Sequence, residues 1–170
     1  GSSGMSATAR RPAGTTPAGS YQIASAFGML PDQKAALGYR LLGETDRWVQ
    51  DPRSSRTYNL LQPGRPRIAT WRRTRETLFA DYPGSFERGL VLAFNRPSKV
   101  YWAPKRKQLI ARVPADVRRG SLLVHTGRRV GRQGWVSMPT RDLSWLTRWA
   151  DPARGTRIVI GTPKYLRDTL

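Results

Sequence analysis

The sequence predicts an α+β fold with N-terminal helices, followed by an antiparallel β-meander or small barrel, and a C-terminal helix. Two observations support this prediction. Before residue 83, apolar residues recur at the three- and four-residue spacing of amphipathic helices. After Gly89, the pattern changes to short runs rich in β-branched and aromatic residues, separated by turn residues roughly every eight to twelve positions, as in consecutive antiparallel strands.

Residues 1–20 are expected to lie outside the folded domain. The first four residues precede Met5 and look like the remainder of an expression tag. The stretch from Met5 to Ser20 is mostly Pro, Gly, Ala and Thr with one arginine pair, which is typical of a disordered basic arm. We therefore expect a single globular domain over residues 21–170, long enough to bury a core without disulfides or metals.

Two helices are predicted in the N-terminal half. Residues 31–43 open on Pro-Asp, end on a glycine and space leucines at 37, 41 and 42 on one face. Residues 67–82 carry an apolar stripe, with Arg72 and Arg73 mostly off it. This second segment therefore predicts an amphipathic helix with a basic flank.

Strands and a final pair of helices are predicted in the C-terminal half. The expected antiparallel strands are residues 90–95, 99–104, 107–113, 121–126 and 134–138. A helix is expected over 140–150, with Thr140 as N-cap, followed by a strand at 156–161 and a short helix from Pro163. Trp145 and Trp149, four residues apart in the first of these helices, are expected to lie in the core rather than against a second copy.

The charge is strongly basic and unevenly distributed. Thirty basic residues against eleven acidic ones give a net charge of +19. Residues 47–75 hold eight arginines against Asp51 alone, and residues 96–132 hold eleven basic residues against Asp116 alone. A compact domain with this charge repels itself, so the expected partner is a polyanion.

Two basic hairpin tips form the predicted nucleic-acid interface. The first hairpin, 99–112, turns at a Lys-Arg-Lys run, and the second, 121–138, turns through a glycine-rich arginine loop. Glycines in that loop would let the backbone lie close to a ligand, and one ring among Tyr101, Trp102 and Trp135 is expected to stack on a base, with Trp102 favoured. The predicted binding residues are Arg65, Arg67, Arg72, Arg73, Lys105, Arg106, Lys107, Arg128, Arg129, Arg132, Trp102 and Trp135.

The predicted function is nucleic-acid binding without catalysis, with RNA favoured over DNA. A homo-oligomer or a larger nucleoprotein complex is left open. One alternative is a nucleic-acid-processing enzyme, a metal-free ribonuclease or a transferase, with His125, the single histidine, as general base. Another is an interaction protein for an acidic partner or an anionic membrane.

Several classes of site are excluded by residue content. The chain has no cysteine, which rules out disulfide scaffolds and thiolate zinc sites, and one histidine cannot build a histidine zinc site. We expect neither a metal nor a cofactor. Because no apolar run approaches the roughly 18 residues of a bilayer-spanning helix, we expect a cytoplasmic protein with no integral membrane association.

Overall fold

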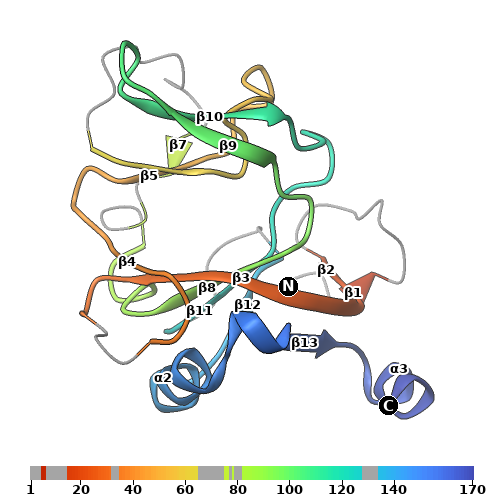
Figure 1. The fold of residues 1–170 in the computed structure, drawn as a ribbon. Helices are drawn as coiled ribbons and strands as arrows, with labels where there is room; N and C mark the ends of the chain where they lie inside the picture. Colours follow the sequence, from red (N-terminus) through yellow and green to blue (C-terminus); the bar gives the residue numbers. More distant parts are fainter. Residues whose placement is uncertain are drawn as a thin grey trace. The chain divides into compact units, whose positions relative to one another are not determined.

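The computed structural model describes two compact units, each built from separate stretches of the chain (Figure 1). The described residues are 5–6, 15–31, 35–64, 75–76, 78, 82–127 and 134–170. Unit 1 draws on Gly1–Leu41, Gly84–Phe94 and Leu122–Leu170, and unit 2 draws on Leu42–Pro83 and Asn95–Ser121. The chain therefore leaves unit 1 for unit 2 twice and returns twice.

The central strand of unit 1 is β3, Gly19–Gly28. Strand β8, Gly89–Leu92, pairs antiparallel with β3 and places Leu90 opposite Ala26. Strand β11, Leu123–His125, pairs antiparallel with β8, and β12, Val136–Ser137, runs parallel to β11. Pairing between segments far apart in the chain thus builds the sheet.

Further strands extend the structure around β3. Strand β13, Arg157–Ile160, pairs antiparallel with the beginning of β3, and β4, Tyr39–Leu41, pairs parallel with its end. The short strands β1, Met5–Ser6, and β2, Thr16–Pro17, form a parallel pair of their own. Residues 15–20, which composition assigned to the arm, therefore include β2 and the start of β3.

Among its described residues, unit 1 also contains two helices and one helical turn. Helix α2, Thr140–Trp149, starts after Pro139 with no side-chain cap, so Thr140 is its first residue rather than its N-cap. A 3₁₀ turn, Pro152–Arg154, precedes β13. Helix α3, Pro163–Thr169, is capped by Thr162, whose Oγ1 accepts a hydrogen bond of 3.2 Å from the Tyr165 amide.

The core of unit 1 lies between this sheet and one face of α2. Helix α2 contributes Leu143, which is fully buried, and β3 contributes Ile23 and Ala26. The remaining buried members are Leu37, Leu90, Leu92, Phe94, Leu122, Val124 and Ala150.

The described residues of unit 2 form two small sheets. Strand β5, Arg47–Val49, lies between β6, Leu61–Gln62, and β7, Arg75–Glu76, and both pairings are antiparallel. Strands β9, Ser98–Ala103, and β10, Gln108–Val113, form a separate antiparallel hairpin. Trp48 of β5 is 2% exposed and is among the largest buried side chains of the described residues.

The prediction of N-terminal helices is wrong: among the described residues the first helix starts at Thr140. The three leucines assigned to one helical face take separate environments. Leu37 is buried in the core of unit 1, Leu41 is 55% exposed, and Leu42 is buried in unit 2. Their spacing matched a helical stripe by coincidence, because tertiary pairing with β3 draws Tyr39–Leu41 into a strand.

The second predicted helix, residues 67–82, lies largely outside the described residues. Within it, Arg75 and Glu76 form β7, which is a strand. The meander or small barrel is also wrong, although strands occur close to most of the expected positions. Strand β9 pairs with β10, as in a meander. Strand β8, however, pairs with β11 and not with β9, which follows it in the sequence.

Candidate nucleic-acid interface

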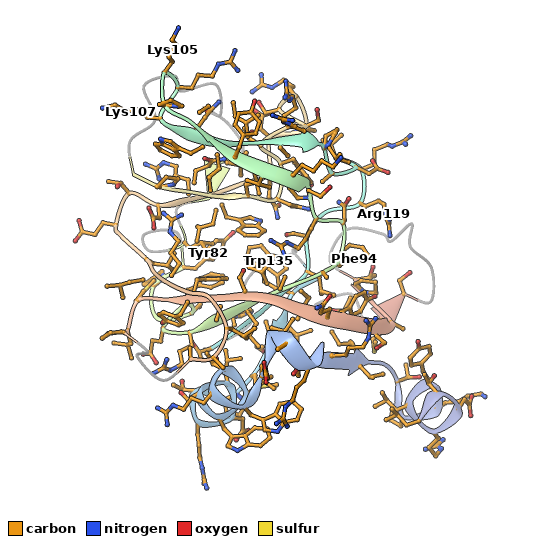
Figure 2. The ribbon with its side chains drawn as sticks, viewed as in Figure 1. Tyr82, Phe94, Lys105, Lys107, Arg119 and Trp135 are labelled. Carbon is orange, nitrogen blue, oxygen red and sulfur yellow. The ribbon has the colours of Figure 1, made fainter. Side chains whose placement is uncertain are left out.

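The β9–β10 hairpin presents the first predicted basic tip. Its turn runs through Pro104–Lys107, where the Arg106 amide donates to the Ala103 carbonyl at 3.1 Å and the Lys107 amide donates to the Pro104 carbonyl at 3.2 Å. Proline suits the second position of such a turn because its φ is already set. Figure 2 shows Lys105 and Lys107 at the tip.

Lys107 closes the turn in the left-handed region, with a φ of 48°. Glycine or asparagine usually occupies this conformation, because a Cβ costs about 1 kcal/mol or more there. The hairpin therefore keeps a lysine at a position where a glycine would fit the backbone better.

Cationic side chains cover this hairpin. Lys105, Arg106 and Lys107 are exposed at the tip, and Lys99 and Arg112 are exposed along the two strands. The sequence from Arg96 to Ala115 contains no acidic residue. The potential at the hairpin is therefore positive along its length, which suits contacts to phosphate.

Two aromatic side chains of β9 accompany these cations. Trp102 is 47% exposed and Tyr101 is 40% exposed. The Arg112 guanidinium carbon lies 5.7 Å from the centre of the Tyr101 ring, a cation–π contact that covers part of one ring face. Trp102 is therefore the ring better placed to stack on a base.

These two neighbouring rings are both exposed, although strand alternation places them on opposite faces of β9. Every residue of β9 from Ser98 to Trp102 is exposed, whereas Ile110 and Ala111 of β10 are buried. The core of unit 2 thus covers β10 and leaves β9 outside.

The inner strand of the hairpin is anchored by a buried glutamine. Gln62 is fully buried, its Nε2 donates to the Leu109 carbonyl at 2.8 Å, and its Oε1 accepts from the Leu109 amide at 2.8 Å. The side-chain amide therefore satisfies both backbone groups of one β10 residue, as a neighbouring strand would. A lone glutamine in β6 gives no sequence signal for this role.

The base of the hairpin is closed by Asn95. Its Nδ2 donates to the carbonyls of Asp116 and Gly120 at 2.8 and 2.7 Å, and its Oδ1 accepts from the Asp116 amide at 2.8 Å. Asn59 donates to the Asn95 carbonyl at 3.0 Å. These bonds join the chain entering the hairpin to the chain leaving it, so the hairpin projects from a fixed base.

Two acidic residues of unit 2 are paired with arginines close by in the chain. Asp51 pairs with Arg53 at 2.9 Å, and Asp116 pairs with Arg118 at 3.2 Å. Hydrogen bonds from the Arg118 backbone and side chain hold the pKa of Asp116 below its usual value. These carboxylates are thus engaged away from the hairpin tip.

The second predicted tip is not the turn of a hairpin. Strands β11 and β12 are parallel, with Val124 opposite Val136, whereas the two arms of a β-hairpin are antiparallel. The loop residues Arg128, Arg129 and Arg132 lie outside the described residues. Arg65, Arg67, Arg72 and Arg73 of the predicted helix flank also lie outside them.

Gly127, at the start of this loop, serves packing within unit 1. Its φ is 85°, and a Cβ placed there would lie 2.8 Å from the Gly84 carbonyl oxygen. The prediction assigned the loop glycines to close contact with a ligand. At this position the close contact is with the protein's own backbone.

His125 and Trp135 are buried, in contrast to their predicted roles. His125 is 1% exposed and Trp135 is 5% exposed, and both pack against Phe86, with ring centres 5.3 and 5.7 Å away. In this structure neither ring presents an exposed face to a base or to a substrate phosphate. These positions correct the predictions of Trp135 as a stacking residue and His125 as a general base.

The imidazole of His125 instead bonds to backbone. Its Nδ1 donates to the Thr126 carbonyl at 2.8 Å. Burial lowers the pKa of His125, and backbone hydrogen bonds with Thr126 and Ser85 oppose this only in part. The side chain is a buried structural element of unit 1.

Comparisons with protein-family models, curated proteins and solved structures found no match to this chain. The fold and the site together therefore define only a class: a mixed, α+β-like protein, mostly sheet, with an exposed basic and aromatic hairpin. Within the described ranges, no helix has the length and apolar character needed to cross a bilayer.

Proposed function

We propose that this protein binds single-stranded nucleic acid, with RNA favoured over DNA, through the β9–β10 hairpin. The observation that carries the proposal is the exposed ring of Trp102 on a hairpin whose tip is Lys105, Arg106 and Lys107 and which contains no acid. The net charge of +19 supports a polyanionic partner.

The cationic side chains and the Trp102 ring would make different contacts with the nucleic acid. Cations at the tip contact phosphates, which supplies affinity without sequence preference. The Trp102 ring stacks on an unpaired base, and such stacking contributes about 1–3 kcal/mol. Duplexes hide their base faces, so this combination favours single strands, and RNA most often offers unpaired bases in loops and bulges.

The setting proposed for this activity is the cytoplasm. A chain without cysteine needs no oxidising compartment to fold, and RNA is available there. Assembly along RNA into a larger nucleoprotein complex is compatible with the proposal.

The test measures binding of fluorescent 12-nucleotide RNA, single-stranded DNA and duplex DNA between 50 and 200 mM salt, about the range over which phosphate contacts weaken. Trp102→Ala should weaken RNA binding about 5- to 150-fold, as expected for the loss of one stacked base. Trp102→Phe, which keeps a ring, should retain most of the affinity. Equal binding by all three proteins would contradict the stacking role.

Charge is tested by a matched pair of triple variants. Replacing Lys105, Arg106 and Lys107 with glutamine should reduce the slope of log affinity against log salt by about 2, because each single-strand phosphate contact contributes about 0.7. The control replaces Arg154, Lys164 and Arg167 of unit 1 with glutamine and removes the same net charge. Equal slopes for the two variants would show that only overall charge matters.

Mass spectrometry of the oligonucleotides after incubation separates binding from catalysis. Intact oligonucleotides are expected. Cleaved products that persist in the Trp102→Ala and tip variants would overturn the proposal in favour of a processing enzyme that uses other residues.

A further inference from the structure

The outward face of α2 carries two tryptophans that the unit 1 core does not use. Trp145 is 61% exposed and Trp149 is 55% exposed, whereas Leu143 and Thr147 form the buried face of the helix. The two indole rings stack on each other, with centres 5.4 Å apart and planes 12° from parallel. Adjacent exposed aromatic rings form a contiguous apolar surface, the kind of feature that large binding patches share.

A hollow of about 500 Å³ adjoins this stack. Its lining is Met138, Arg141, Asp142, Trp145 and Leu146. Trp145 belongs to this lining and Trp149 does not, so the hollow adjoins one member of the stack. A flat group that enters the hollow would extend the stack by one ring.

We propose that this hollow binds an unpaired guanine base of single-stranded nucleic acid, stacked on Trp145. The inference rests on the proposed function and assigns it a second contact, in unit 1, made by residues other than those of the hairpin. A second copy of this chain is a poor occupant because it would bring another +19 charge to a helix that already carries Arg141 and Arg148.

The polar residues of the lining suit a nucleotide. The Arg141 guanidinium can bind a phosphate with two parallel hydrogen bonds or stack on a base. The Asp142 carboxylate accepts hydrogen bonds through both oxygens, and guanine presents two adjacent N–H donors at N1 and N2. Uracil presents only one such donor, so guanine should bind more tightly.

The probe that tests the hollow directly is guanosine monophosphate, with uridine monophosphate as the comparison. Titration of the ¹⁵N-labelled protein should shift the indole N–H signals of Trp145 and Trp149, and the guanine nucleotide should do so at several-fold lower concentration. Trp145→Ala should abolish the shift of Trp149. Asp142→Asn should reduce the preference for guanine while leaving stacking in place.

Control variants keep this test independent of folding and of the hairpin. Trp145→Phe preserves a ring and should retain binding, and Leu170→Ala removes an apolar side chain that is 88% exposed and should change nothing. If neither nucleotide shifts Trp145 or Trp149, the inference is overturned, while salt-sensitive RNA binding that depends on Trp102 would leave the proposed function standing.

Two other outcomes would also overturn the inference. A sedimentation mass that falls from dimer to monomer in Trp145→Ala would show that the face joins two copies. Shifts of Trp145 caused by an acidic peptide with leucine anchors, but not by guanosine monophosphate, would show a protein-binding face.

Discussion

Burial of His125 links the stability of unit 1 to pH. Its pKa lies below the ordinary value of 6.5 because the ring is desolvated against Phe86 and Trp135. Between the lowered pKa and 6.5 the unfolded chain binds more protons than the folded one, so stability falls as the pH falls. We expect the free energy of unfolding, measured by urea titration, to decrease below pH 6.5 with a slope of at most about 1.4 kcal/mol per pH unit.

The control for this prediction uses the fact that the chain has one histidine. His125→Phe keeps an aromatic ring beside Phe86 and removes the titrating group. Its stability should be nearly flat between pH 5.5 and 8, a range chosen to lie above the usual carboxylate pKa values of about 4. Parallel curves for the two proteins would refute the assignment.

Replacing Lys107 is expected to change the stability of the fold and its affinity for RNA in opposite directions. Lys107→Gly should raise the free energy of unfolding by up to about 1 kcal/mol, because glycine adopts positive φ without a Cβ penalty. The same change should weaken RNA binding and lower the salt slope by about 0.7, since one phosphate contact is lost. Urea titration and the salt series check the two effects, and Lys105→Gly, which tests the charge alone, should not stabilise the fold.

At the scale of elements, Gln62 ties the hairpin to the rest of unit 2. Gln62→Ala leaves the Leu109 amide and carbonyl without their partner, so we expect a loss of about 2–4 kcal/mol in unfolding free energy. Hydrogen exchange should show reduced protection of the Leu109 amide in particular. Gln22→Ala, at an exposed position of β3, is the control, and a similar effect for both variants would count against a specific anchor.

Helix α2 shows how far an element can be predicted from local pattern. Its position agrees with the predicted segment 140–150, because spacing and breaker residues are local properties. Its orientation was predicted incorrectly, since Leu143 faces the core while Trp145 and Trp149 face outward. The size of a side chain does not determine which side of an amphipathic helix meets the sheet.

At the scale of the whole molecule, the two basic blocks of the sequence fall largely in unit 2. Residues 47–75 and 96–119 both belong to it, whereas the slightly acidic segment between them contributes Gly84–Phe94 to unit 1. Unit 2 is the smaller unit by residue number, yet it holds sixteen of the thirty basic residues. The double crossing of the chain therefore concentrates charge that the sequence spreads over two separate stretches.

The local sequence pattern was sufficient to predict the first hairpin tip and its cationic residues. Turn residues at 104–107, flanked by β-branched and aromatic runs, specify a hairpin through contacts between near neighbours, and the structure contains it. The strong positive charge likewise follows from composition alone.

Which rings are buried and where the other strands form was decided by tertiary pairing, because the segments that contact one another lie far apart in the chain. Burial of His125 depends on Phe86, exposure of Trp102 depends on how β10 is covered, and the strand at Tyr39–Leu41 depends on β3. Hydrophobic spacing reports which residues avoid water, but it does not report which distant segment covers them. The basic character and the hairpin were thus readable from the sequence, whereas the tertiary structure alone separated the exposed rings from the buried rings.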